Sequence, residues 1–336
     1  MAGNLSDMSK KSNEKNLYNP RLALYKNLTK TSNGRDDSPQ EIRRQRLLWE
    51  QKKNRDATFD SGRALLDEAL QGSDCNDERM EVQQDETWRC NRRVPQYANQ
   101  LMMSEWMLEI PSDLSEKWLM VPCPQGRRVL LIASKGATTA YNKRGVRLGK
   151  FTSALPGGTY QDYKNRCTIL DCIWDKDTKT YYTLDVLAWS NQPLLDCDTE
   201  FRFFWLKTRL EETQGLAERG SLVNSYPILS LPNYPCDCDA GAVLENLSSL
   251  PPLDGLLFYH REAHYTQGRT PLVNWLKPFM LSDVFGFQFP PDIYEKPPDY
   301  VDIKSYIRKN KTTRRKNKGP DESMEIISAE NLVEMA

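Results

Sequence analysis

Histidine is scarce in this sequence, and no stretch is long and apolar enough to cross a bilayer. Only 2 histidines occur among 336 residues, and the 8 cysteines form no Cys-x-x-Cys pair, so a zinc site has few ligands to draw on. No apolar run approaches the ~18–20 residues of a membrane-spanning helix, and no P-loop or GxGxxG motif occurs. The opening residues, MAGNLSDMSKKSNEKN, do not predict a secretory signal. We therefore expect free thiols in a reducing compartment, no metal, no cofactor and no membrane partner.

Positive and negative charges balance over the whole chain but are separated along it. Lys and Arg total 46, and Asp and Glu total 46, which excludes a protein coated with positive charge for binding nucleic acid. Residues 1–66 hold 14 basic and 8 acidic side chains, whereas residues 67–86 hold eight acids and one arginine. Any anion-binding surface must therefore be local.

The basic N-terminal segment contains one predicted helix. Ser38 can cap it, Pro39 suits the first helical position and Glu41 completes a capping box, which predicts a helix over 38–70. Its first half has few large apolar side chains, so we expect it not to be anchored in a large core. The rest of the arm is expected to be unfolded. The cations that decorate this helix are Arg43, Arg44, Arg46, Lys52, Lys53 and Arg55.

The composition and patterning of the sequence change near residue 97. Short apolar and aromatic runs such as RRVLLIAS, TILDCIWD, KTYYTLDVLAW and FRFFWL alternate with turn residues, which predicts strands, with a hairpin turn at 176–178. QYANQLMMSEWM and PLVNWLKPFM are interpreted as helical pieces. An antiparallel-rich α+β domain is the expected fold class. The predicted segments are an arm over 1–66, an acidic flexible linker over 67–96, the folded domain over 97–292 and a disordered polar tail over 293–336.

Two of the 8 tryptophans lie beside polar residues. Ser104 and Glu105 precede Trp106, and Asn274 precedes Trp275. Tryptophans are usually core residues, but an aromatic ring with a serine and nearby cations is also what a base-stacking pocket requires. Both interpretations stay open from the residues alone.

Two runs resemble motifs of nucleotidyltransferases such as mRNA capping guanylyltransferases and ligases. DGLLFYH, at 254–260, resembles a strand of that fold, and PCPQGRRVLLIAS aligns with its Lys-x-Asp-Gly-x-Arg motif, with Gly126 and Arg128 matching. Cys123 stands at the lysine position and Gln125 at the aspartate position. Because the lysine amine forms the covalent nucleotide adduct in that family, the resemblance implies the capping-enzyme nucleotide-binding fold without its catalytic activity.

The stretch NPRLALYKN and the basic helix after it resemble the importin-β-binding domain of nuclear import adaptors, which has an Arg-x-x-x-aromatic-Lys-Asn element. The resemblance implies a binding segment over about 20–64. Such a cationic segment can fold on an acidic receptor, with arginine forks binding carboxylates in bidentate fashion. The implied importin-binding residues are the six helix cations together with Arg21, Tyr25, Lys26 and Asn27.

Over about residues 20–290, the sequence resembles the snurportin family. YANQLMMSEWMLEIPSDL, TILDCIWD, KTYYTLDVLAW, FRFFWL and DGLLFYHREAHYTQGRTPLVNWLKPFMLSDV carry the resemblance. Snurportins bind the 2,2,7-trimethylguanosine cap of spliceosomal small nuclear RNAs and import these ribonucleoproteins on importin β. The implied cap-binding residues are Ser104, Trp106, Cys123, Arg128, Lys143 and Trp275.

The resemblance also implies a role for each of these residues. Trp275 would stack on the methylated guanine, Trp106 would lie near its methylated exocyclic edge, and Ser104 would contact the base edge. Arg128 and Lys143 would lie near the phosphates. Cys123, at the lost lysine position, is expected on the wall of the pocket.

Partners follow from the same resemblance. It implies importin β, capped small nuclear RNA and an exportin of the leucine-rich-signal class, with shuttling between nucleus and cytoplasm. Only Leu5, Met8 and Leu17 provide apolar side chains for an exportin contact. Two other interpretations stay open: an active capping-type guanylyltransferase, and an importin-α-like adaptor with a protein-binding body, although no helical repeat of ~40–47 residues is present.

Overall fold

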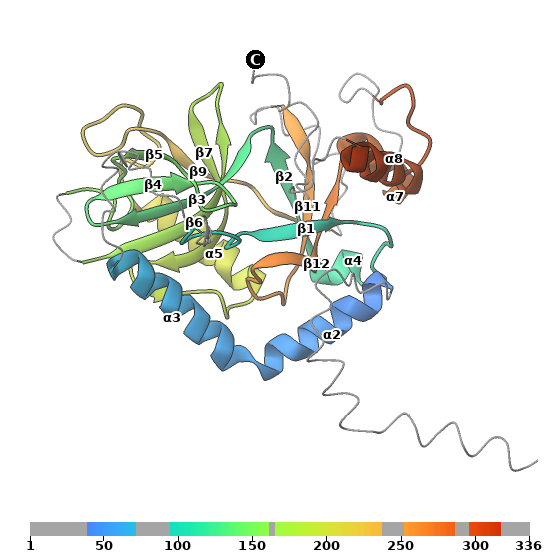
Figure 1. The fold of residues 1–336 in the computed structure, drawn as a ribbon, viewed down its shortest axis with the longest axis horizontal. Coiled ribbons are helices and arrows are strands. Elements are labelled where there is room, and N and C mark those ends of the chain that lie inside the picture. The colour runs from blue at the N-terminus through green and yellow to red at the C-terminus, as the bar shows by residue number, and fades with distance from the viewer. Residues whose placement is uncertain (1–38, 72–94, 161–164, 237–251, 286–295, 317–336) are drawn as a thin grey trace, which may run out of the picture. The chain divides into compact units, whose positions relative to one another are not determined.

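The computed structural model describes residues 39–71, 95–160, 165–236, 252–285 and 296–316. The chain divides into two units, Met1–Pro39 and Gln40–Ala336, and every element described below belongs to the second unit. Two β-sheets form this unit, and helices pack on them (Figure 1).

The first sheet has five strands in the order β1-β12-β11-β2-β10. β1 and β12 pair in parallel and the other pairs are antiparallel. Pro271 has no N–H to donate, and it lies where the partner of β1 jumps from Thr270 to Asn274, so an irregularity in the ladder accommodates it. The strands are β1 (Met102–Trp106), β2 (Trp118–Pro124), β10 (Tyr234–Pro235), β11 (Leu253–His260) and β12 (Gly268–Leu276).

The second sheet has the order β5-β4-β3-β6-β7-β8, and β9 pairs in parallel with β7. The turn predicted at 176–178 joins β6 to β7, which confirms that hairpin. The strands are β3 (Arg127–Ser134), β4 (Ala137–Tyr141), β5 (Arg147–Phe151), β6 (Cys167–Asp175), β7 (Thr180–Trp189), β8 (Gln192–Pro193) and β9 (Ile228–Ser230).

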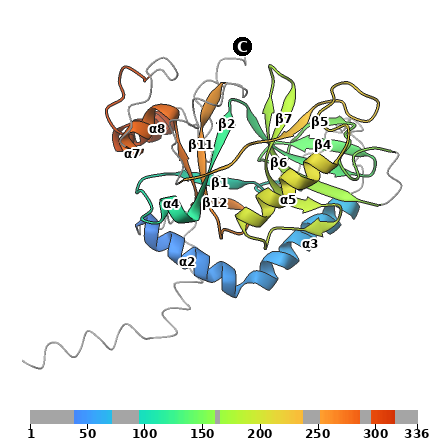
Figure 2. The same cartoon turned by 180° about the vertical axis from the view of Figure 1, so that it is seen from behind.

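Seven helices complete the described part of the chain. α5 lies on the second sheet, as Figure 2 shows, whereas α2 and α3 meet at an angle and run beneath both sheets in Figure 1. No helix among the described residues is both long and apolar enough to span a membrane. The helices are α2 (Gln40–Lys53), α3 (Arg55–Gln71), α4 (Leu114–Lys117), α5 (Thr199–Glu212), the 3-10 helix η2 (Pro278–Met280), α7 (Leu281–Phe285) and α8 (Ile303–Lys316).

The largest apolar cluster lies between the two sheets. It contains Val121 of β2, Ile132 of β3 and Trp275 of β12, together with Leu65 and Leu66 of α3. A second cluster joins the second sheet to α5, and a third joins the first sheet to α4, η2 and α7, with α8 packed against it. Because burying one large apolar side chain contributes about 1.5–3 kcal/mol, these clusters hold the sheets and helices together.

The predicted fold class is confirmed, but three local assignments are wrong. The two segments that hold Trp106 and Trp275 are strands β1 and β12, not helices. β12 is buried on both faces from Thr270 onward, and such a run does not show the period of two that marks a half-buried strand. FRFFWL lies in helix α5, where Arg202, Phe203 and Leu206 are buried at helical spacing.

The arm and the tail also differ from expectation. α3 extends to Gln71, past the expected end of the arm at residue 66, and Leu65, Leu66 and Ala69 are buried in the core between the sheets. The prediction of a helix without a core anchor is therefore wrong, since the anchoring side chains lie in its second half. α8 lies inside the segment expected to be disordered. The division into four segments otherwise stays a prediction, because most of 67–96 lies outside the described residues.

Candidate functional site

The two tryptophans singled out from the sequence lie next to each other across the first sheet. Trp106 ends β1, Trp275 lies in β12, and the two residues are register partners in the parallel pair. Side chains of directly paired residues project from the same face of a sheet. Trp275 is 8% exposed, whereas Trp106 is half-buried and meets the edge of the Tyr306 ring, with centroids 6.2 Å apart. The pair thus places a buried indole beside a partly exposed one.

Trp275 lies against a glycine of the neighbouring strand. A Cβ on Gly255 would lie 2.4 Å from Cζ2 of Trp275 and 2.6 Å from the carbonyl oxygen of Leu276, so only glycine leaves room for the indole. The Nζ atom of Lys277 lies 5.8 Å from the centroid of the Trp275 ring, and it forms an ion pair with Asp254. A cation, a carboxylate and the indole are thus brought together where β11 begins and β12 ends.

Cys123 lies opposite Gly255 in the ladder between β2 and β11. It is 2% exposed, and its Sγ atom lies 3.6 Å from the carbonyl oxygen of Val121. Burial raises the pKa of the Cys123 thiol, although the positive charge of Arg128 acts in the opposite direction. The thiol is therefore protonated and unreactive at neutral pH.

Arg128 reaches the same interior from the second sheet. Burial disfavours its charge, but attraction to Asp171 and the hydrogen bonds between them outweigh burial and raise the pKa of Arg128. Nε and Nη2 of Arg128 donate to the two carboxylate oxygens of Asp171, at 2.8 and 2.7 Å. The hydroxyl of Tyr265 also donates to Asp171, at 2.7 Å. The fork of Arg128 is thus held by a carboxylate in this structure.

Ser104 lies in strand β1, and the backbone of Lys143 contacts the segment that leads into β1. Ser104 is buried in β1, opposite Thr270 and just before the irregularity in the ladder. Lys143 follows β4, and its carbonyl oxygen accepts a hydrogen bond from the backbone N–H of Asn99, at 2.8 Å, just upstream of β1. The six predicted residues thus come from strands of both sheets and from a loop that contacts the segment leading into β1.

Four residues at this site were missed in the sequence analysis. Asp254 and Gly255 begin the run DGLLFYH and Lys277 lies in PLVNWLKPFM, but neither run predicts a role for these residues. Asp171 carried a usable signal, since an acid inside the apolar run TILDCIWD predicts a buried ionic partner. The partner itself was not predictable, because Arg128 belongs to a different strand.

Helix α2 docks beside the tryptophan pair through polar contacts. Arg43 donates to both carboxylate oxygens of Glu105, at 2.6 and 2.8 Å, and Glu105 lies between Ser104 and Trp106. Nε2 of Gln40 donates to the carbonyl oxygen of Trp106, at 3.0 Å. α2 is thus bonded directly to strand β1.

Other cations of this segment also contact the folded domain. Two of the predicted importin-binding cations have partners within α2. Arg46 pairs with Glu50, at 4.0 Å, and Nζ of Lys53 lies 5.2 Å from the centroid of the Trp49 ring. The predicted residues Arg21, Tyr25, Lys26 and Asn27 lie outside the described residues. The contacts with the domain are Arg44 to the carbonyl oxygen of Glu109 at 3.1 Å, Lys52 to Glu262 at 3.0 Å and Arg55 to Asp196 at 3.2 Å.

A comparison with protein families assigns the class of this domain. Residues 100–278 match the family model described as "Snurportin1, m3G cap-binding domain", where m3G denotes trimethylguanosine. The matched residues hold both tryptophans and every other predicted cap-binding residue. The domain is therefore an RNA cap-binding domain. Since the match covers more than half of the chain, the chain belongs to the snurportin family.

Solved structures that match part of this chain include DNA ligases. The ligase domain of M. tuberculosis LigD is similar over 53% of this chain and 58% of that chain, with 16% identity and a TM-score of 0.37. A mycobacterial DNA ligase D complexed with ATP and MES is similar over 54% of this chain and 61% of that chain, with 15% identity and a TM-score of 0.36. This chain thus spans about three fifths of each ligase chain. Likenesses of this degree carry no conclusion about activity, and the predicted descent from a nucleotidyltransferase stays a prediction.

Proposed function

We propose that this protein is a nuclear import adaptor that binds the 2,2,7-trimethylguanosine cap of spliceosomal small nuclear RNAs and links the ribonucleoprotein to importin β. Such an adaptor shuttles between cytoplasm and nucleus, and an exportin of the leucine-rich-signal class returns it. The observation that carries the proposal is the register pairing of Trp106 with Trp275 inside a domain of the snurportin family.

The chemistry of the cap suits this pair of indoles. N7-methylation makes guanine cationic, so an indole face gains stacking worth about 1–3 kcal/mol and a cation–π attraction of about 0.5–2 kcal/mol. The two N2 methyl groups remove both N–H donors from that edge of the base. An apolar wall such as Trp106 accepts these methyl groups, and selectivity per methyl group is about 1–3 kcal/mol.

The contacts of α2 support the importin part of the proposal. Arg43 and Lys52 of α2, and Arg55 at the start of α3, each pair with a carboxylate of the folded domain. A segment that selects carboxylates on its own domain is chemically suited to an acidic receptor. We infer that importin β replaces these intramolecular carboxylates, so α2 leaves β1 when the receptor binds.

We propose that the protein has no catalytic activity. An active capping-type guanylyltransferase needs a nucleophilic amine at the position of Cys123, and a buried thiol whose pKa is raised does not replace it.

The deciding experiment is a titration of the full chain with trimethylated, monomethylated and unmethylated cap analogues. We expect the trimethylated analogue to bind most tightly. Equal affinity for all three would contradict the cap-binding proposal. Incubation with labelled GTP and Mg²⁺ serves as the test of the alternative, because a covalent protein–GMP adduct would establish the transferase.

A further inference from the structure

Helix α8 carries positive charge only. Its sequence, IKSYIRKNKTTRRK, holds seven Lys or Arg residues and no Asp or Glu. The helix is attached through Ile307, which is 3% exposed, and through Tyr306, whose ring meets the edge of Trp106. Lys309 also forms an ion pair with Asp299, at 3.3 Å, and this pair leaves most of the positive charge of the helix to be accounted for.

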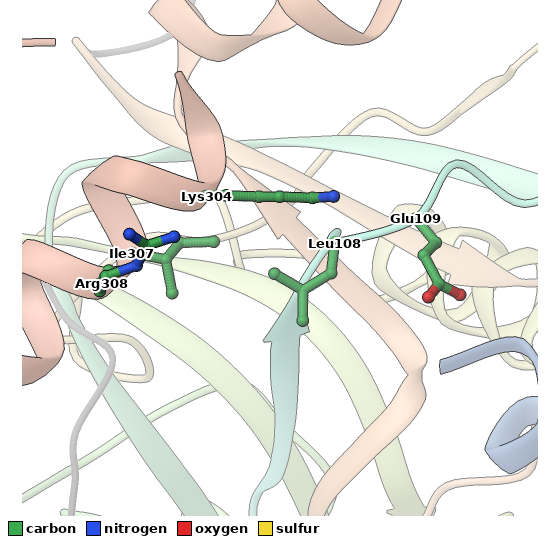
Figure 3. A pocket seen from close by; sticks show the side chains of 5 residues that line it. All are labelled: Leu108, Glu109, Lys304, Ile307 and Arg308. Carbon is green, nitrogen blue, oxygen red and sulfur yellow. The ribbon is translucent and has the colours of Figure 1, made fainter. Parts of the chain in front are cut away.

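A cavity of about 350 Å³ lies between α8 and the chain that follows β1. Figure 3 shows Lys304, Ile307 and Arg308 reaching into it from α8, and Leu108 and Glu109 from the segment after Trp106. Lys304 and Arg308 are four residues apart and so share one face of the helix. The lining combines apolar side chains with two cations and one carboxylate, and the volume lies in the range of ligand pockets.

We propose that this cavity and the basic face of α8 bind the ribose–phosphate chain of the RNA that follows the cap. This proposal rests on cap binding as proposed above. Leu108 lies two residues beyond Trp106, so an RNA chain that leaves the tryptophan pair past β1 meets Lys304 and Arg308 next. Lys304 and Arg308 are about 6 Å apart along the helix axis, which gives room for two phosphates.

The surroundings of the cavity favour RNA over an acidic protein as the partner. Trp106 and Tyr306 place two aromatic rings next to the cations, and aromatic rings beside cations are the usual surface for a single-stranded nucleic acid. An acidic protein requires cations but makes little use of partly buried aromatic rings, whose remaining exposed surface can stack with a base. Glu109 opposes an anion, but Lys304 and Arg308 outnumber it in the same cavity.

The test compares two ligands on the full chain: a trimethylguanosine-capped dinucleotide and the same cap on a ten-nucleotide RNA. We expect the longer RNA to bind roughly five-fold or more tightly at low salt. The variant Lys304→Glu/Arg308→Glu should lose this gain and keep its affinity for the dinucleotide. Its salt dependence with the longer RNA should also weaken, by about 1.4 in the slope of log K against log salt for two phosphates.

Two controls accompany the test. Lys176→Glu/Lys179→Glu makes the same charge change on the β6–β7 turn and should bind both ligands like the unchanged protein. Lys304→Gln/Arg308→Gln removes charge without reversing it, and circular dichroism checks that each variant is folded.

The outcomes separate the two proposals. Failure of the unchanged protein to bind the dinucleotide would overturn the cap-binding function itself. Dinucleotide binding without any gain for the longer RNA, or a gain that survives both substitutions at Lys304 and Arg308, would overturn the RNA-binding role of α8. The charge of α8 would then point to an acidic protein partner.

Discussion

Trp275 is both a buried residue and the predicted stacking residue. Trp275→Phe keeps a ring in the core but offers a smaller face, so we expect cap affinity to fall by up to about 1–3 kcal/mol with a small decrease in Tm. Trp189→Phe is the matched control, because Trp189 is 6% exposed in the cluster beneath α5. It should lower Tm and leave cap affinity unchanged. Tm and a cap titration on the same sample measure both effects, and equal affinity losses in the two variants would make Trp275 a core residue only.

Gly255 tests the contact between β11 and the indole. Its missing Cβ would lie under 3.0 Å from ring atoms of Trp275 and from the carbonyl oxygen of Leu276, so Gly255→Ala forces a shift that we expect to cost about 1–3 kcal/mol of stability. Nothing lies within 4 Å of the same position at Gly149 in β5. Urea unfolding should therefore show a small change, within about 0.5 kcal/mol, for Gly149→Ala. Equal stability of the two variants would rule out the close contact.

At the scale of elements, α2 and β1 form one polar contact. The fork of Arg43 holds the carboxylate of Glu105, and both side chains are less than a fifth exposed. Arg43→Gln should loosen α2, so backbone hydrogen exchange across 40–53 should become several-fold faster. Arg46→Gln is the control, because Arg46 is 54% exposed and contacts Glu50 within the same helix. Unchanged exchange in both variants would mean that the other contacts of α2 hold it without the Arg43–Glu105 pair.

For the whole molecule, the two histidines predict the effect of pH on stability. Burial lowers the pKa of both His260 and His264. A histidine in the unfolded chain titrates near 6.5, so below that pH the unfolded state binds more protons and the free energy of unfolding falls. The stability that the two neutral histidines contribute is complete above about pH 6.5. It is lost as the pH falls through their lower pKa values in the folded state.

The measurement is a set of urea unfolding curves between about pH 7.5 and 5.5, above the range where carboxylates titrate. We expect the midpoint to fall toward the acidic end, and His264→Gln to reduce that fall, since it removes one of the two groups. A midpoint that does not change with pH, or an identical fall in the variant, would contradict the assignment.

The class of fold, the β6–β7 hairpin and the family were predictable from the order of the residues. These features depend on local patterns: apolar runs between turns, a polar turn at 176–178, and motifs whose residues are close along the chain. Asp171 and Asp185 lie inside these apolar runs, where an acid needs a buried partner, but only the structure identifies Arg128 and Arg202 as the partners.

Which distant residues meet depends on how the strands and helices pack. Trp106 and Trp275 are neighbours because β12 lies between β1 and β11, an order that local propensity does not specify. A strand that is buried on both faces lacks the alternation of apolar and polar residues that distinguishes a strand from a helix, so the sequence of β12 predicted a helix. The docking of α2 depends on Arg43 meeting Glu105, 62 residues away. Side-chain chemistry shows that each needs a partner, but the packing of strands and helices selects the partner.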